Sequence, residues 1–145
     1  MPILDRFLAY AQDFETTYVD DDWTRLQQYF APDANYEVTG ATPCVLRGRD
    51  AIFRGIKKSL DGFDRKFTKR AIEIEGTPRV EGDTVMVDWL GVYERPGAPA
   101  LRVRGTSIAR YAGDVIAHLK DVMKPDESTM NWFGQYGAGL DGSYS

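Results

Sequence analysis

The sequence predicts an α+β fold, in which helices from both ends of the chain accompany one curved, antiparallel β-sheet. Three observations carry this prediction: apolar residues at helical spacing before residue 63, three consecutive strand-like runs from Asp83 to Met123, and an apolar helix near the end. Because helical and strand-like segments are segregated along the chain, the pattern favours α+β over a βαβ arrangement. We expect a single domain over residues 1–137 and a loose tail over residues 138–145.

The helices are predicted from their apolar stripes. The stripe of the first helix recurs every three or four residues and consists of Ile3, Leu4, Phe7, Leu8, Ala11, Phe14 and Tyr18. A short second helix is expected to end at Pro32, and a third is expected to run from Asp50, as N-cap, to Gly62. A last helix is expected to begin at Pro125, because proline suits a first helical position, and to end at Gly137.

The strands are predicted from β-branched and aromatic runs bounded by glycine and proline. A short strand is expected over residues 35–39, followed by a loop over residues 40–48. A four-stranded meander should follow, with a turn region at residues 76–82 and strands at residues 67–75, 84–93, 101–111 and 115–123. Strands this long twist and curl, so the sheet should have a concave side that the helices cover.

Composition excludes several classes of partner. The chain has 145 residues, a net charge of −4 and a pI of about 5.0, which argues against nucleic acid and against an anionic membrane surface. It contains no apolar run long enough to span a membrane, and the start lacks the pattern of a signal peptide, so we expect a cytoplasmic protein. One cysteine, Cys44, and one histidine, His118, offer no metal cluster, so we expect no cofactor.

Three stretches resemble the NTF2-like superfamily, and specifically its SnoaL-like branch. The first runs from Asp21 to Glu37 and contains Phe-Ala-Pro-Asp-Ala at residues 30–34; the second is Arg47-Gly-Arg-Asp-Ala-Ile52; the third is the meander with its last strand. The resemblance implies a cystatin-like cone, in which the curled sheet and the helices enclose a hydrophobic pocket. Relatives of this kind include ketosteroid isomerases, polyketide cyclases, epoxide hydrolases and modules without catalysis, so the fold alone does not give the function.

The resemblance argues against the ketosteroid isomerase activity and matches the epoxide hydrolase site only in part. The positions that match the base, the oxyanion tyrosine and the oxyanion acid of ketosteroid isomerases hold Val38, Phe14 and Ser107. The positions that match the arginine and one acid of epoxide hydrolases hold Trp89 and Gly91. The remaining acid of the epoxide hydrolases, and the late-strand acid of SnoaL-type cyclases, match Asp121. This aspartate is therefore the catalytic residue that the resemblance implies.

Strand alternation supports the same residue. It places Ala117, Leu119, Asp121 and Met123 on one face of the last strand, where a carboxyl is unusual. Burial would raise the pKa of Asp121 and make it a base near neutral pH, able to take a proton next to a carbonyl or to activate water. Tyr36, Tyr93 and Ser107 would then donate to the substrate oxygen. The remaining expected substrate-binding residues are Phe14, Val38, Trp89, Leu119 and Met123.

Alternatives remain at this point. Asp121 could instead cap the terminal helix or pair with an arginine. The first functional hypothesis is a small cofactor-free cyclase, isomerase or hydrolase that acts on an apolar compound. The second is a pocket protein that binds such a compound without catalysis, which the lack of a second predicted acid, histidine or arginine in the pocket favours. The third is an association module. Apolar residues on the outer sheet face predict a homodimer through that face: Met86, Leu90, Val92, Ile108 and Val122.

Overall fold

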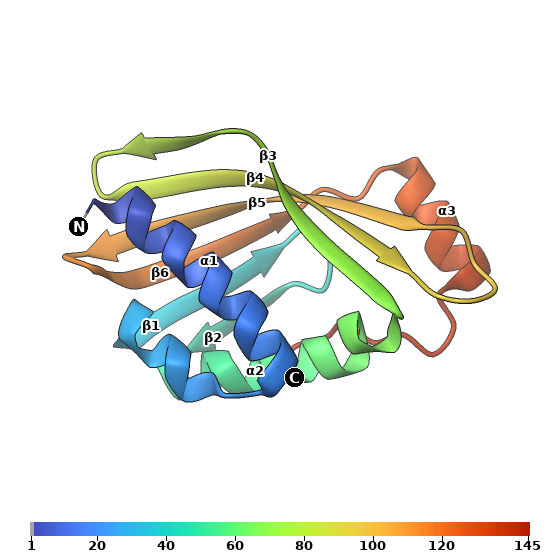
Figure 1. Ribbon diagram of the computed structural model, residues 1–145, viewed down its shortest axis with the longest axis horizontal. Helices are drawn as coiled ribbons and strands as arrows, with labels where there is room; N and C mark the ends of the chain where they lie inside the picture. The colour runs from blue at the N-terminus through green and yellow to red at the C-terminus, as the bar shows by residue number, and fades with distance from the viewer. Residues whose placement is uncertain (1) are drawn as a thin grey trace.

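The computed structural model describes residues 2–145 as a curled six-stranded sheet with helices against its concave face (Figure 1). The helical segments are α1 (Ile3–Asp20), η1 (Trp23–Tyr29), α2 (Arg49–Gly62), η2 (Asp64–Lys66) and α3 (Glu127–Tyr136). The strands are β1 (Phe30–Thr39), β2 (Cys44–Arg47), β3 (Lys69–Glu81), β4 (Thr84–Glu94), β5 (Leu101–Ala112) and β6 (Val115–Met123). The α+β class and the cone shape that the sequence predicts are confirmed.

The sheet has the order β2-β1-β6-β5-β4-β3 and contains the predicted meander from β3 to β6. It is mixed and not purely antiparallel, because β1 runs parallel to β6. Residues 40–48, expected to be a loop, include β2, which pairs antiparallel with β1. Pro32 lies inside β1, whereas we expected it to end a helix. These differences all concern β1 and β2: β2 has only four residues, and β1 pairs with β6, which lies far along the chain.

Two irregularities in the strands correct the expected register. Residues 76–82 belong mostly to β3, because Gly76, at a φ of 67°, sits in a register shift between Glu75 and Arg79 and the strand continues past it. A second shift, at Arg110 and Tyr111, brings Ile116 into the core. This bulge means that simple alternation fails for Ala117, although Leu119, Asp121 and Met123 keep the expected pocket face.

Two clusters of buried side chains hold the fold together. The larger joins α1, η1 and α2 to the middle of the sheet and includes Leu26, Phe30, Ile52 and Ile116, each at most 1% exposed. The smaller fixes α3 to the other end of the sheet and consists of Phe67, Tyr93, Leu101 and Trp132. The pocket lies beside the larger cluster, so its walls are made of packed elements.

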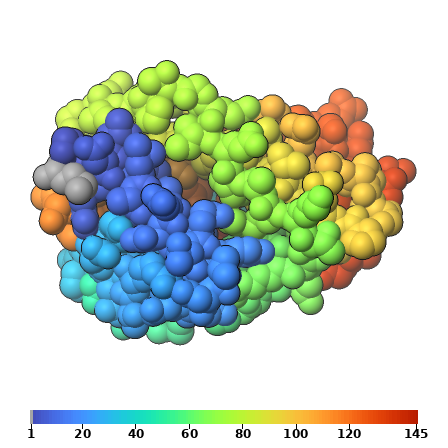
Figure 2. Space-filling model, in the orientation of Figure 1, coloured from blue at the N-terminus to red at the C-terminus, as the bar shows by residue number. Residues whose placement is uncertain are grey.

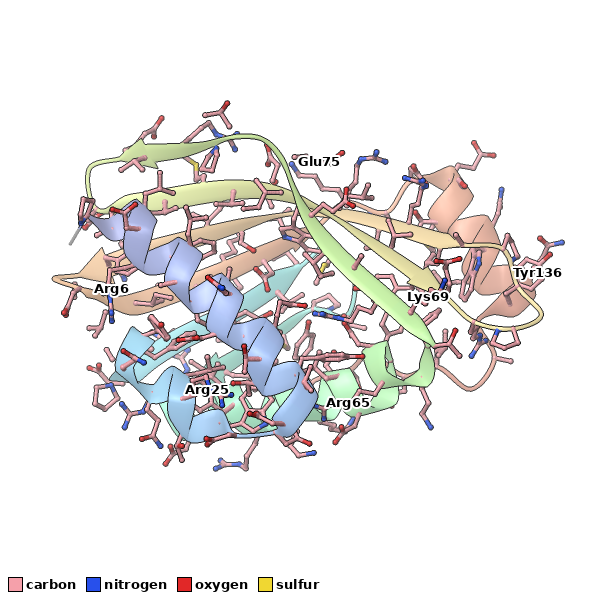
Figure 3. The ribbon with its side chains drawn as sticks, viewed as in Figure 1. Arg6, Arg25, Arg65, Lys69, Glu75 and Tyr136 are labelled. Atoms are coloured by element: carbon pink, nitrogen blue, oxygen red, sulfur yellow. The ribbon has the colours of Figure 1, made fainter. Side chains whose placement is uncertain are left out.

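Side-chain hydrogen bonds fix the helix ends. The ends of α1 and α2 lie close together near Arg65 (Figure 3). Arg65 donates to the Tyr18 carbonyl and pairs with Asp21 and Asp61. At α3 the N-cap is Asp126, whose carboxylate accepts from the Thr129 N–H at 2.8 Å, so Pro125 lies outside the helix. Asp50, the expected cap of α2, lies inside the first turn instead.

The segment after α3 has no helix or strand, but it is not loose. The Asp141 N–H donates to the Gly62 carbonyl at 3.0 Å, and the Ser59 hydroxyl donates to the Gly142 carbonyl at 2.7 Å. Tyr144 packs against the larger core cluster. A single aromatic residue among glycines and serines gives no period in the sequence, which is why the tail was expected to be free.

The outer face of the sheet carries both apolar and paired charged side chains. Met86, Val92, Ile108 and Val122 are half-buried, and Leu90 is buried. Arg79 pairs with Asp88 at 3.0 Å, and Arg104 pairs with Glu75 at 3.0 Å. The homodimer through this face remains a prediction. We expect sedimentation at micromolar concentration to give twice the mass of one chain; a single-chain mass would contradict it.

Among residues 2–145, no helix is both long enough and apolar enough to cross a membrane.

Candidate active site

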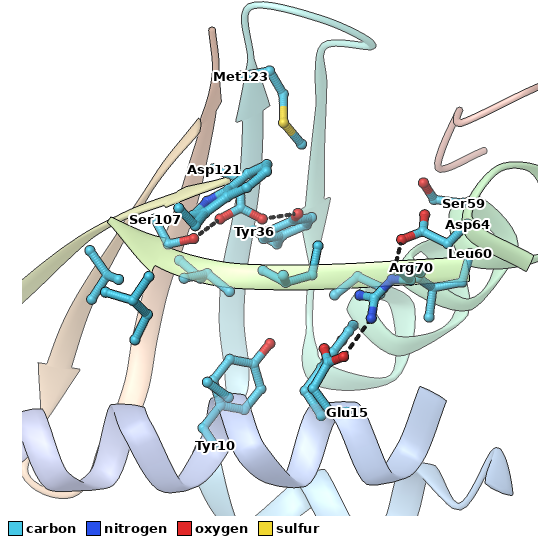
Figure 4. Close-up of a pocket in the computed structure, with 18 of the residues that line it drawn as sticks. Tyr10, Glu15, Tyr36, Ser59, Leu60, Asp64, Arg70, Ser107, Asp121 and Met123 are labelled. Atoms are coloured by element: carbon cyan, nitrogen blue, oxygen red, sulfur yellow. Dashed lines mark hydrogen bonds and ion pairs between the residues drawn. The ribbon is translucent and has the colours of Figure 1, made fainter. Parts of the chain in front are cut away.

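A pocket of about 220 Å³ lies between α1 and the concave face of the sheet. Figure 2 shows the hollow between α1 and β3 that marks its mouth. Aromatic and aliphatic side chains form most of its wall, and Figure 4 shows two separate polar groups on that wall. The residues that line the pocket include Tyr10, Phe14, Glu15, Tyr36, Asp64, Arg70, Trp89, Tyr93, Ser107, Leu119, Asp121, Met123 and Tyr144.

Asp121 forms the first polar group, with two hydroxyl donors from neighbouring strands. Ser107, its direct cross-strand partner on β5, donates to Oδ1 at 2.6 Å, and Tyr36 on β1 donates to Oδ2 at 2.5 Å. No salt bridge in the described part of the chain includes Asp121, and the α3 cap is Asp126. Both structural alternatives for this aspartate, a helix cap and an arginine pair, are therefore wrong.

The environment of Asp121 favours its neutral form. Burial raises the pKa of the carboxyl above its ordinary value of 3.8, and the hydrogen bonds from Ser107 and Tyr36 oppose this shift without cancelling it. Asp121 keeps some exposed surface although protein surrounds it, and that surface faces the pocket that it lines. A carboxylate has about four lone-pair positions, so two accepted hydrogen bonds leave room for a proton from a bound molecule.

The raised pKa predicts a pH-dependent stability difference between the wild type and Asp121→Asn. Above the ordinary value of 3.8 the unfolded chain loses this proton first, so the wild type should lose stability relative to the variant as pH rises. The wild type should be most stable relative to the variant below 3.8, where the carboxyl is neutral in both states, and the difference should be constant again above the folded pKa. Urea unfolding from about pH 4 to about pH 8 measures it. A difference that does not change with pH would contradict a raised pKa.

Tyr10 of α1 points its hydroxyl into the same pocket (Figure 4). The side chain is 7% exposed, and its hydroxyl makes no hydrogen bond with any residue from 2 to 145. In that range, the side-chain polar atoms that are both fully buried and without a hydrogen-bond partner are Arg49 Nε and the Tyr111 hydroxyl. The Tyr10 hydroxyl has no partner and is not one of these, so it faces open space. Burial, followed by the nearby Asp121, raises the pKa of Tyr10, which keeps it a hydrogen-bond donor.

Tyr144, from the segment after α3, closes the pocket beside Tyr36. The two rings meet edge-to-face with centroids 5.7 Å apart. Burial raises the pKa of Tyr144, with a further contribution from Asp121, so its hydroxyl also remains protonated near neutral pH. The wall around Asp121 therefore presents hydroxyl donors.

Arg70 of β3 forms the second polar group together with two acids. Its Nε donates to Asp64 Oδ2 at 2.7 Å, and its Nη1 donates to Glu15 Oε1 at 2.5 Å. The Tyr93 hydroxyl lies 3.5 Å from the same Asp64 oxygen. Burial raises the pKa of Asp64 despite the opposing Arg70 charge; burial would lower the pKa of Arg70, but Asp64 and Glu15 raise it. The pocket thus contains the second acid and the arginine that the sequence reading missed.

The structure places the predicted site residues as follows. Asp121, Phe14, Tyr36, Trp89, Tyr93, Ser107, Leu119 and Met123 all line the pocket. Val38 does not: it is the β1 partner of Asp121 in the sheet and lies in the core at 1% exposure. Tyr36 and Ser107 donate to Asp121, and Tyr93 lies beside Asp64, so none of the three has its hydroxyl directed freely into the pocket.

Some of the missed residues left a signal in the sequence. Tyr10 lies three residues after Phe7 and four before Phe14, which places it on the apolar stripe of α1. Arg70 lies two residues before Ile72 and four before Ile74, and residues two apart in a strand share a face. The sequence therefore places Arg70 on the face of these isoleucines. No comparable signal exists for Asp64, because it follows a helix end in a segment with no period.

No group of three or more His, Cys, Asp or Glu side chains in the described range is arranged to hold a metal ion. The Asp121 site has hydroxyl partners, and the Asp64 site is joined to an arginine, which is a poor companion for a cation.

Comparison with known proteins identifies the family. The family described as SnoaL-like domain matches residues 11–119, which is more than half of the chain and runs from the second half of α1 into β6, ending just before Asp121. The chain belongs to the SnoaL-like domain family. A comparison with curated proteins finds no match to this SnoaL-like chain.

Solved structures show the same fold at low sequence identity. A protein from Jannaschia Sp. CCS1, assigned as a SnoaL-like polyketide cyclase, has a TM-score of 0.70 at 13% identity, over 93% of this chain and 96% of that chain. TerC co-crystallised with polyporic acid has a TM-score of 0.67 at 13% identity, over 93% and 100%. A protein from Catenulispora acidiphila DSM 44928 with a ketosteroid isomerase-like fold, in complex with trimethylamine, has a TM-score of 0.62 at 20% identity, over 94% and 96%. These similarities show the fold.

Proposed function

We propose that this SnoaL-like protein is a cofactor-free enzyme in which Asp121 is the general base for a small apolar carbonyl compound. The observation that carries the proposal is the Asp121 carboxyl on the wall of an apolar pocket, held by two hydroxyls, with a raised pKa. A base is most effective when its pKa lies near the working pH, and burial moves a carboxyl in that direction.

The proposed step is proton abstraction next to the carbonyl. Asp121 takes the proton from the carbon, and the electron pair of the broken C–H bond moves onto the carbonyl oxygen as an enolate. The Tyr10 hydroxyl, which has no partner among the described residues, donates to that oxygen. Tyr36 and Ser107 hold the carboxylate in position, which replaces the substrate-donor role that the sequence suggested for them. Returning the proton from Asp121 to another carbon isomerises the compound. In a substrate with a second carbonyl group, the enolate carbon attacks that carbonyl carbon and closes a ring, its C=O π electrons move onto the oxygen, and this alkoxide takes the proton from Asp121.

The pocket volume limits the substrate. An apolar cavity of about 150 Å³ holds benzene in another protein, so about 220 Å³ accommodates a one-ring or small two-ring compound. A polycyclic substrate would need the mouth between α1 and β3 to open. Two proteins with this fold, crystallised with polyporic acid and with trimethylamine, support a small-molecule ligand.

Hydrogen exchange tests the proposal without knowledge of the natural substrate. Small ketones such as cyclohexanone, acetophenone and indanone are incubated with the wild-type protein in D₂O, and loss of the proton signal next to the carbonyl is followed by NMR. We expect exchange above the buffer rate for those ketones that bind. Binding of several ketones with no exchange for any of them would overturn the general-base assignment.

A second candidate is a pocket protein that binds an apolar compound without chemistry. It is favoured by the two hydrogen bonds that Asp121 already accepts, because they satisfy a buried carboxyl without any substrate. The same experiment separates the two functions, since this candidate predicts saturable binding and exchange at the buffer rate only.

A further inference from the structure

The second polar group of the pocket lies apart from Asp121 and has unused hydrogen-bonding capacity. Figure 4 shows Asp64, Arg70 and Glu15 at one end of the pocket and Asp121 with Ser107 and Tyr36 at the other. The Arg70 side chain is only 7% exposed, and that of Asp64 only 11%. Arg70 uses Nε and Nη1 for its two acids, whereas its Nη2 makes no hydrogen bond within the described range.

Two atoms of this group keep hydrogen-bonding capacity in residues that line the pocket. Asp64 uses Oδ2 for Arg70 and Tyr93. Its carboxyl also accepts from its own backbone N–H, and its Oδ1 accepts from no other side chain among the residues described, so lone-pair positions are left over. Both residues are deep in the protein and line the pocket. Arg70 Nη2 and Asp64 Oδ1 do not belong to the fully buried polar atoms that lack a partner in the described range. Such groups are costly to desolvate, so a ligand that displaces water from them must replace its hydrogen bonds.

The pair of free atoms selects a chemical group. Arg70 Nη2 is a donor and Asp64 Oδ1 is an acceptor, and a hydroxyl both accepts and donates, so it can satisfy the two together. With both acids ionised, the group carries one more negative than positive charge, which opposes a carboxylate or a phosphate on the ligand. A methyl group in the same place would leave both polar atoms unpaired.

We infer that Arg70 and Asp64 bind a hydroxyl group of the substrate, at the end of the molecule opposite the carbon that Asp121 deprotonates. The substrate class is then a small ring compound with a carbonyl at one end and a hydroxyl at the other. The orientation rests on the proposed function of Asp121, whereas the hydroxyl preference rests on the Arg70–Asp64 geometry alone.

Matched ligands test this inference by affinity. 4-Hydroxyacetophenone, 4-methylacetophenone and 4-acetylbenzoate share one ring and one acetyl group and differ only in the opposite substituent. Calorimetric titration near pH 6, where the phenol is neutral, should give a Kd for the hydroxyl compound about 10- to 100-fold below that of the methyl compound, since hydrogen bonds to charged groups have this strength. The carboxylate should bind more weakly than either. Equal Kd values for the hydroxyl and methyl compounds would overturn the inference.

Variants separate recognition from a structural role. Asp64→Asn keeps the size of the side chain but presents a different hydrogen-bonding pattern, so it should reduce the hydroxyl-to-methyl preference about tenfold or more and change the Kd of the methyl compound little. A purely structural role would weaken both ligands equally. Glu15→Gln, which changes the other acid of Arg70, is the matched control and should keep the preference. Asp121→Asn should also keep the hydroxyl-to-methyl preference. Loss of hydrogen exchange in this variant therefore tests the proposed base, and loss of the preference in Asp64→Asn tests the hydroxyl site.

Discussion

Replacing Asp121 with asparagine is expected to slow hydrogen exchange of bound ketones by about 10²- to 10⁴-fold, the usual contribution of a general base. Asparagine has nearly the same shape, and its oxygen can accept from Tyr36 while its amide donates to a turned Ser107 hydroxyl. The pocket should therefore stay intact, and ketone affinity should change little. NMR exchange rates at saturating ketone, together with a Kd from calorimetry, measure the two effects separately.

Asp50→Asn is the matched control for this experiment. Asp50 is exposed in the first turn of α2 and does not line the pocket, so the same chemical change there should leave both exchange and affinity at the wild-type level. If Asp121→Asn binds the ketones and exchanges them at the wild-type rate, another group is the base and the proposed mechanism is wrong.

Replacing Arg70 with methionine is expected to destabilise the fold by about 3–5 kcal/mol. The change removes the positive partner of Asp64 and Glu15, and a buried ion pair that loses one partner leaves an uncompensated buried charge. The stack of the Arg70 guanidinium on the Tyr18 ring, 4.3 Å from its centroid, is lost as well. Urea unfolding monitored by tryptophan fluorescence measures the effect.

Arg104→Met gives the comparison that assigns this cost to burial. The Arg104 side chain is 49% exposed and pairs with Glu75 at 3.0 Å on the outer face, so its loss should cost at most about 1 kcal/mol. Similar costs for the two variants would contradict the role assigned to burial. A double variant, Arg70→Met with Asp64→Leu, should regain part of the stability, because it removes the stranded carboxylate.

The parts of the fold that the sequence predicted are those with a strong period. Seven apolar positions define α1, β4 is dense in β-branched and aromatic residues, and β5 begins with a strict apolar/polar alternation, so these elements were readable. The β2 strand has only four residues, and β1 gains its partner from β6, far along the chain. Long-range pairing of this kind leaves no local signal, because the pairing energy depends on residues that the local window does not contain.

The candidate site shows the same division. Asp121 could be found because an acid on an otherwise apolar strand face breaks a pattern. Asp64 could not, since it becomes buried only when Arg70 of β3 folds over it from another element. Tyr144 reaches the pocket because the Ser59 hydroxyl and the Asp141 N–H join its segment to α2, and no period in that segment predicts these contacts. Tyr10 and Arg70 lay within the readable periods of α1 and β3.

The position of Tyr144 has a practical consequence for work on this protein. Its ring forms a wall of the pocket beside Tyr36, and hydrogen bonds from the Ser59 and Lys58 side chains and from the Asp141 N–H join this segment to α2. We expect a purification tag or fluorescent fusion joined after Ser145 to disturb these contacts and to change ligand affinity. Attachment before Pro2 avoids the problem, because no side chain of the N-terminal residues 2–6 lines the pocket.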